Sequence, residues 1–200
     1  MLIKMEAKMR GKRMRHTLRL YTILNAAKRT EYYKKNQIFK SMGENCLIMD
    51  RKVPLYAGLI SIGNNVLIAS DVMFITHDVT HSMLNNMDEL IASRGGVKYS
   101  EKIGCIEIGD NVFVGAGTTI NYDVRIGSNV IIGACSLITK DVPDNSVVAG
   151  VPAKFICTFD EYLKKRDSKE FPDLGNSAEE ISASAESEAW QQFRRSRTSG

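Results

Sequence analysis

The sequence lacks the features that mark fibrous, disordered and membrane-spanning proteins. Only 4 of its 200 residues are proline and 15 are glycine, which excludes collagen-like and proline-rich disordered chains. The longest apolar runs, such as 66–69 and 130–132, are far shorter than the roughly 18 residues of a membrane-spanning helix. Apolar residues nevertheless make up 44% of the chain. We therefore expect one domain with a sizeable core, flanked by tails.

Cysteines and secretory signals are also scarce. The four cysteines, Cys46, Cys105, Cys135 and Cys157, include no C-x-x-C pair, so their spacing fits neither a zinc ribbon nor a disulfide-stapled scaffold. The N-terminus is basic but lacks the apolar region and the small-residue cleavage site of a secretory signal. We expect a cytoplasmic protein with reduced thiols.

Positive charge is concentrated in residues 1–40, which hold 12 Lys and Arg against 2 Glu, although the net charge of the chain is only +4. Apolar residues recur there at steps of three and four, which predicts an amphipathic helix over residues 10–30: Met14, Leu18, Tyr21, Leu24 and Ala27. The opposite face is basic. Our favoured interpretation is a helix packed on the main domain or on a neighbouring subunit. The alternative is a helix on the inner face of an anionic membrane, and we do not expect nucleic acid as the partner.

A repeat of six residues runs through the middle of the chain. Large apolar residues occupy every sixth position in two runs: Ile62, Ile68 and Phe74, then Ile108, Val114, Ile120, Ile126, Ile132 and Ile138. Neither a period of two nor one of 3.6 produces this pattern, which is typical of the hexapeptide parallel β-helix. The first residue of each hexad is expected to point inward. The fourth, such as Asn65, Asn111 or Asn129, is expected at a corner that tolerates left-handed backbone.

The same pattern sets the expected domain boundaries and an all-β fold class. Hexads begin loosely at residues 42–47 and end near Val142, which places the β-helix at 41–159 after a basic helical segment at 1–40. Residues 160–200 are expected to hold a short helix that closes the open end of the solenoid. From Ser168 we expect a mobile tail with a brief helix around Trp190.

The repeat is interrupted between Phe74 and Ile108, so most of residues 78–105 is expected to protrude as a loop, and long loops are usually functional. His77 stands at the root of this loop, and His81 lies just inside it. A histidine there suits a general base, and a merely structural histidine is about as common. Two histidines also permit a metal, but no third ligand joins them, so we expect none. His16 is interpreted as incidental.

Together these residues resemble the hexapeptide-repeat O-acetyltransferases, in the branch of the maltose, galactoside and xenobiotic enzymes and close to the capsular and surface-polysaccharide acetyltransferases. The resemblance covers about residues 41–166. Its motifs are Ile62-Gly63-Asn64-Asn65-Val66, Thr76-His77-Asp78, residues 108–117, residues 126–134, Thr139-Lys140-Asp141-Val142-Pro143 and Ala149-Gly150-Val151-Pro152-Ala153-Lys154. It implies a left-handed β-helix, a homotrimer with active sites between subunits, and acetyl-CoA as the donor.

The resemblance also implies roles for particular residues. His77, at the loop root, corresponds to the general base that lets a hydroxyl of a sugar or polysaccharide precursor attack the thioester directly. The backbone N–H of Ala116 corresponds to the oxyanion donor. Coenzyme contacts carry over to Ala134, Thr139, Lys140 and Lys154. Cys157 stands where some relatives have a further basic residue.

The acceptor site is less well marked, because residues 49–61 have no clear match to the acceptor-binding side chains of the galactoside enzymes. Asp50, Asn64, Asp71, Asp78 and His81 are the candidates for it. Within the same class, the alternatives are an N-acetyltransferase of an amino sugar and a serine or xenobiotic acetyltransferase. From other classes, the alternatives are a γ-carbonic anhydrase-like zinc protein and a non-catalytic basic scaffold.

Overall fold

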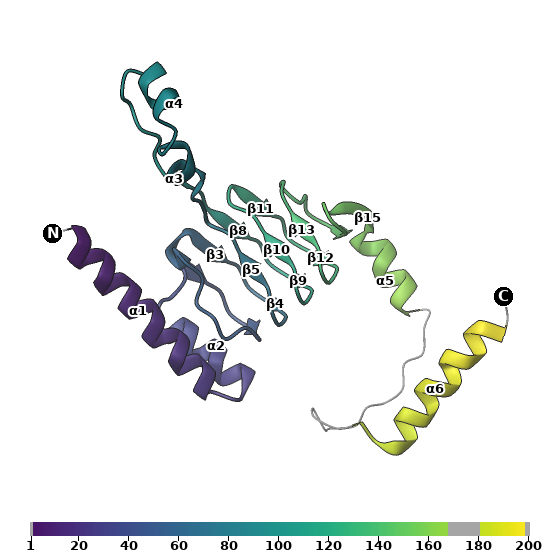
Figure 1. Ribbon diagram of the computed structural model, residues 1–200. Coiled ribbons are helices and arrows are strands. Elements are labelled where there is room, and N and C mark those ends of the chain that lie inside the picture. The colour runs from purple at the N-terminus through teal and green to yellow at the C-terminus, as the bar shows by residue number, and fades with distance from the viewer. Residues whose placement is uncertain (1, 168–180, 199–200) are drawn as a thin grey trace. The chain divides into compact units, whose positions relative to one another are not determined.

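A computed structural model of the protein describes residues 2–167 and 181–198. The chain divides into two units, residues 1–160 and residues 161–200. In the first unit, short parallel strands stack in successive coils and form a β-helix, and helices α1 and α2 lie at the end where the first coil begins (Figure 1). No helix in the described part of the chain is both long and apolar enough to cross a membrane.

Three sheets form the sides of the β-helix. The first contains β1 (Ser41–Met42), β3 (Ile60–Ile62), β8 (Ile106–Ile108) and β11 (Val124–Ile126). The second contains β2 (Leu47–Ile48), β4 (Val66–Ile68), β9 (Val112–Val114), β12 (Val130–Ile132), β14 (Ser146–Ala149) and β15 (Lys154–Thr158). The third contains β5 (Met73–Phe74), β10 (Thr119–Ile120) and β13 (Leu137–Ile138).

The hexad positions stack as the period predicts. Ile120 pairs with Phe74 on one side and with Ile138 on the other, and Ile108 pairs with Ile62 and Ile126 in the same way. Nearly all of the inward-facing residues are at most 2% exposed. The core is therefore a continuous column of aliphatic side chains, which removes apolar surface from water at every coil.

The corners also follow the expectation. The three fourth-position residues named for a corner, Asn65, Asn111 and Asn129, have positive φ angles of 54–57°. With Asn145 they form an amide ladder in which Asn65 donates to Asn111, Asn111 to Asn129, and Asn129 to Asn145, at 2.8–2.9 Å. Asparagine suits this row because it tolerates left-handed backbone and carries both a donor and an acceptor.

An all-β class is too narrow, because 34% of the chain is helical. The single helix expected over residues 10–30 is instead two helices, α1 (Leu2–Thr22) and α2 (Ala26–Lys35), separated by a break that Asn25 caps. Within the single chain, Met14, Leu18 and Leu24 are 61–81% exposed, whereas Leu20 is fully buried, so the side of α1 that packs on the β-helix is the one with Leu20. The spacing of apolar residues alone did not show which of two apolar stripes on α1 packs on the β-helix.

A buried arginine holds the two helices to the first coil. The guanidinium of Arg29, 5% exposed, donates to the carbonyl oxygens of Ile23 and Leu24 in the helix break and to that of Met49 just after β2. Burial is the main reason that the pKa of Arg29 is lowered. The N-terminal helices are therefore packed on the β-helix by a specific polar contact as well as by Leu20 and Tyr33.

The loop predicted at residues 78–105 stands off the coils (Figure 1) and contains two short helices, α3 (Thr80–Leu84) and α4 (Asp88–Ser93). Its two ends pair as antiparallel strands, β6 (His77–Asp78) and β7 (Lys102–Ile103). Paired coil residues lie 46 positions apart across the loop, 18 apart in the coil that follows it, and 16–20 apart over the whole β-helix outside the loop. The insertion therefore leaves the coil register intact.

Beyond the last full coil, β15 turns back and pairs antiparallel with β14, an edge strand that the sequence pattern did not predict. The short helix expected near residues 160–166 is α5 (Phe159–Asp167), and its role as a cap stays a prediction. A helix around Trp190 is present as α6 (Ala183–Thr198). The part of the expected tail at 168–180 lies outside the described residues.

Candidate active site

His77 is fixed by its neighbours at the loop root. The chain enters the loop through Thr76, which is fully buried and whose hydroxyl donates to the carbonyl of Leu55 at 2.7 Å. Thr76 also accepts, through its carbonyl, the N–H of Gly104 at 3.0 Å, where the loop returns. Because both bonds are made by the residue before it, His77 has little freedom to move away from the coil.

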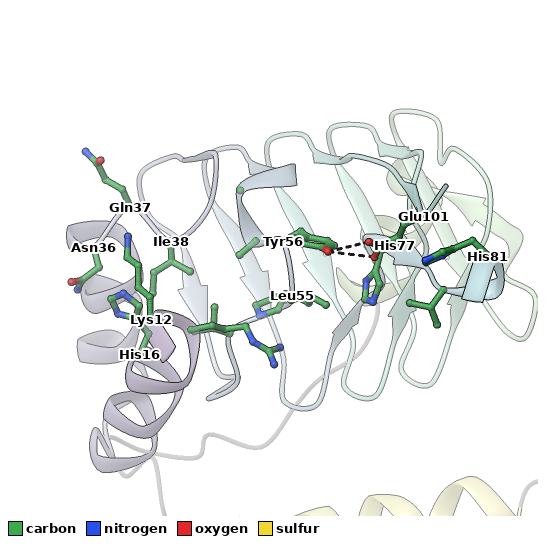
Figure 2. Close-up of a pocket in the computed structure, with 16 residues that line it drawn as sticks. Lys12, His16, Asn36, Gln37, Ile38, Leu55, Tyr56, His77, His81 and Glu101 are labelled. Carbon is green, nitrogen blue, oxygen red and sulfur yellow. Dashed lines mark hydrogen bonds between the residues drawn. The ribbon is translucent and has the colours of Figure 1, made fainter. Parts of the chain in front are cut away.

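Tyr56 and Glu101 complete the surroundings of His77. The Tyr56 ring meets the His77 ring edge to face, with centroids 5.4 Å apart and an interplanar angle of 82°. The Tyr56 hydroxyl donates to the carboxylate of Glu101, with both carboxylate oxygens at 3.3 Å (Figure 2). The Nδ1 atoms of His77 and His81 are buried and have no hydrogen-bond partner among the described residues. Each ring therefore has one nitrogen whose hydrogen-bonding capacity the described residues leave unused.

These side chains line an open cavity of about 630 Å³ in the first unit. Figure 2 shows His77, Glu101 and His81 at one end of this cavity, Lys12 and His16 at the other, and Leu55 and Tyr56 between them. The segment from Val53 to Gly58, which reaches into the 3-10 turn η1 (Ala57–Leu59), forms one wall. A ligand site of this kind typically has about 300–1,000 Å³.

The far end of the cavity is basic. Lys12, Arg13 and His16 line it from α1, and Asn36, Gln37 and Ile38 line it from the segment after α2. His16 is bonded through Nδ1 to the Tyr32 hydroxyl at 2.9 Å. Burial, and then the charges of Lys12 and Arg15, lower the pKa of His16 below its ordinary value of 6.5. Burial and these two neighbouring cations therefore both disfavour the charged form of the imidazole.

A second cavity, of about 410 Å³, lies where three predicted coenzyme-binding residues meet. Thr139, Lys140 and Lys154 line it together with Pro152 and Phe155. Ala116 and Ala134 do not line it, but both are exposed at one corner of successive coils, and the carbonyl of Ala116 accepts the N–H of Cys135 at 2.8 Å. At this corner a side chain on Gly115 would come within 2.5 Å of the backbone nitrogen of Ala134. Only small residues fit there, which leaves the corner open to a ligand arm.

The structure places the five candidate acceptor-binding residues in different surroundings. His81 lines the first cavity, whereas Asp50, Asn64, Asp71 and Asp78 do not. Asn64 is held in a corner between Asp110 and the backbone of Glu44. Asp71 is an exposed corner residue.

The carboxylates of Asp50 and Asp78 each accept hydrogen bonds from backbone N–H groups. Asp50 accepts from Arg51 and Lys52, and burial raises the pKa of its carboxyl despite those bonds. Asp78 accepts from Thr80 at 2.7 Å at the start of α3, and that bond is the main reason that the pKa of its carboxyl is lowered. Both carboxylates accept hydrogen bonds from their own loop segments, and neither residue lines the first cavity.

Several cavity residues were missed by the sequence reading. Lys12, Arg13 and His16 reach the cavity only because α1 packs against the segment that contains Val53, where the hydroxyl of Thr17 accepts the Val53 N–H. Tyr56 and Glu101 belong to no recognisable sequence motif. The only sequence feature that points to them is the interruption of the repeat at 49–61 and at 78–105, because both interrupted segments contribute residues to this cavity.

No cluster of three or more potential metal ligands was found among the described residues.

Residues 105–140 match the family described as bacterial transferase hexapeptide (six repeats). Protein CapG of Staphylococcus aureus is 46% identical over 114 residues, which cover 54% of this chain and 57% of CapG. The chain spans about half the length of the curated relatives that it matches.

Two solved structures share the fold. A maltose O-acetyltransferase from Clostridium difficile 630 is 29% identical, with a TM-score of 0.55 over 76% of this chain and 87% of that one. A galactoside acetyltransferase in complex with coenzyme A is 29% identical, with a TM-score of 0.52 over 77% of this chain and 84% of that one. These acetyltransferase neighbours imply that the β-helix is left-handed.

Proposed function

We propose that the chain transfers the acetyl group of acetyl-CoA to a hydroxyl of a sugar or polysaccharide precursor, with His77 as the general base, because residues 105–140 match the bacterial transferase hexapeptide family and a galactoside acetyltransferase shares the fold. One observation carries the proposal: His77 lines the larger cavity with a buried Nδ1 that has no partner in the described part of the chain. A buried polar atom without a partner is unfavourable unless another molecule completes it. Relatives named for maltose and galactoside acetylation favour a sugar hydroxyl over an amine, serine or a xenobiotic.

The proposed chemistry is a direct transfer. The His77 imidazole removes the proton from the acceptor hydroxyl as its oxygen attacks the thioester carbonyl carbon. The ester C–O bond forms, the C–S bond breaks, and the imidazolium returns the proton to the departing thiolate. The N–H of Ala116 is assigned to the negative charge that develops on the carbonyl oxygen. This route forms no acyl-enzyme, so none of the four cysteines is required as a nucleophile.

The smaller cavity is assigned to the phosphate end of the coenzyme. Lys140 and Lys154 supply two cations beside Thr139, and phosphate groups require cations of this kind. The pantetheine arm is assigned to the corner of Ala116 and Ala134, where small residues permit close approach. The donor and the acceptor thus approach His77 from different cavities.

The test compares two histidines of one cavity. His77→Ala is expected to lower kcat roughly 10²–10⁴-fold, the usual contribution of a general base, while acetyl-CoA binding measured by calorimetry is unchanged. His81→Ala is the matched control, because its ring lines the same cavity, and it is expected to keep kcat within about tenfold. Undiminished turnover by His77→Ala would refute the proposed role.

The assembly and location are part of the proposal. A homotrimer with active sites between adjacent subunits, in the cytoplasm, is the arrangement that the family resemblance implies. Light scattering of the purified protein at several concentrations tests it, with a mass of three chains expected. A stable monomer with full activity would contradict it.

We also assign the exposed side of α1 to the surface of an anionic membrane. Met14, Leu18 and Tyr21 are 56–63% exposed along this helix, and Arg15 and Arg19 are exposed beside them. Apolar and cationic side chains side by side match an anionic lipid interface, where each basic residue adds about 1 kcal/mol of attraction.

Sedimentation with vesicles tests this surface. Binding is expected to phosphatidylglycerol vesicles and not to phosphatidylcholine vesicles, and Met14→Gln/Leu18→Gln is expected to weaken it. Met83→Gln, an exposed methionine on α3, is the matched control. Binding that ignores the α1 substitutions would rule this surface out.

A further inference from the structure

The basic end of the larger cavity has positive charge that the described protein does not neutralise. Lys12 and Arg13 both line it. Neither Lys12 nor Arg13 forms an ion pair with a carboxylate in the part of the chain that the structure describes. Two adjacent cations that face a cavity without a counter-ion favour an anionic ligand.

The charge of the cavity is divided between its ends. Glu101, the carboxylate that lines it, lies at the His77 end and is occupied by the Tyr56 hydroxyl. His16, at the opposite end, is bonded to Tyr32 and lies close enough to Lys12 for that charge to lower its pKa. A ligand that spans the cavity therefore meets His77 at one end and two cations at the other.

We propose that the acceptor is a sugar that carries an anionic group, a phosphate or a carboxylate, and that Lys12 and Arg13 bind this group while a sugar hydroxyl lies at His77. The inference rests on the proposed function and deepens it. The cavity of about 630 Å³ is large enough for a sugar with such a substituent. Arginine suits either group, because its planar fork donates two parallel hydrogen bonds to a phosphate or a carboxylate.

A binding measurement tests the subsite without any turnover. Pyrophosphate is titrated by calorimetry into protein saturated with coenzyme A, so that Lys140 and Lys154 are not available to it. Saturable binding is expected in the wild type and its loss in Lys12→Gln/Arg13→Gln. The matched control is Lys28→Gln/Lys35→Gln, which removes the same charge from exposed positions of α2 outside the cavity and is expected to bind as the wild type does. No binding by the wild type, or equal binding by both double variants, would overturn the subsite.

Kinetics identify the source of the anion. Methyl glucoside, glucose 1-phosphate, a nucleoside-diphosphate glucose and glucuronic acid are compared as acceptors, with the galacto and manno series in parallel. The phosphorylated or the carboxylated member is expected to have a kcat/KM at least 10-fold above its neutral counterpart, and Lys12→Gln/Arg13→Gln is expected to remove that advantage. Equal loss for neutral and anionic acceptors would mean that the two residues are merely structural.

The two proposals fail in different ways. If the wild type binds pyrophosphate but neither binds acetyl-CoA nor acetylates any acceptor, the subsite stands and the proposed acetyl transfer falls. If the wild type acetylates neutral and anionic sugars equally well and binds no pyrophosphate, the acetyl transfer stands and the anionic acceptor is refuted.

Discussion

Replacing Thr76 by valine removes one hydrogen bond that holds the wall of the cavity against the loop root. The Thr76 side chain is fully buried, and its hydroxyl donates to the Leu55 carbonyl at 2.7 Å. Valine has nearly the same volume, so packing is retained and the carbonyl is left without its partner. Leaving a buried acceptor unsatisfied costs about 1–3 kcal/mol. For a domain of this size a loss of ~2 kcal/mol lowers Tm by roughly 4–8 °C.

The same change is expected to affect catalysis, because Leu55 precedes Tyr56, whose ring meets that of His77. A looser wall lets both rings move, and we expect kcat to fall roughly tenfold while the affinity for acetyl-CoA, assigned to the other cavity, is unchanged. Thr76→Ser keeps the hydroxyl and is expected to restore most of kcat.

Thr30→Val separates stability from positioning. Thr30 is also buried, and its hydroxyl donates to Ala26 and accepts the N–H of Ile48, but it does not line the cavity. This variant is expected to lose stability and keep kcat. Thermal unfolding at one fixed protein concentration and steady-state kinetics provide the comparison. If Thr76→Val unfolds at the wild-type temperature, or loses no more kcat than Thr30→Val, the reasoning is refuted.

Three further predictions follow from single features. Lys140→Gln and Lys154→Gln are each expected to weaken coenzyme A binding about 5- to 10-fold in calorimetry, since an exposed charge contact to phosphate is worth roughly 1 kcal/mol; unchanged affinity would remove the assignment of the smaller cavity. Burial lowers the pKa of His16 below 6.5, so the folded state favours the neutral imidazole more than the unfolded state does. The stability that this provides is complete above pH 6.5 and is lost as the pH falls below 6.5. The urea midpoint of the wild type is therefore expected to drop between pH 7 and 5 more than that of His16→Asn. Ile120→Ala is expected to destabilise the protein by about 2–5 kcal/mol, because Ile120 is fully buried in the central column, whereas Ile103→Ala at an exposed loop strand changes stability by less than about 0.5 kcal/mol.

The features that the sequence predicted are those that the repeat enforces. Most hexads place their first residue in the column and their fourth at a corner, so one period determines both the burial of Ile120 and the positive φ of Asn111. His77 was found for a related reason, since an interruption of the repeat marks a place where the chain does something other than coil.

The remainder of the site depends on contacts that no local pattern records. Met14 and Leu20 are equally apolar, and only the shape of the coil surface decides that Leu20 packs inward and Met14 does not. The basic end of the cavity exists because α1 lies along the segment around Val53, and Tyr56 reaches His77 through a break in the repeat. Such residues meet through tertiary packing between distant segments, which overrides periodicity as a guide.

The loop insertion explains how a rigid coil carries a reactive side chain. The chain leaves at Thr76 and returns at Gly104, one hydrogen bond of 3.0 Å apart, so the coils on either side keep their register. Closing a loop costs free energy that rises only with the logarithm of its length, so length and content are free to vary between these fixed ends. His77 is the first residue beyond that boundary, where it pairs with Ile103 in β7, and His81 lies four residues farther along the loop. The division places the proposed base next to the coil, where the two ends of the loop are paired, and leaves access to it to the part that is free to change in length and content.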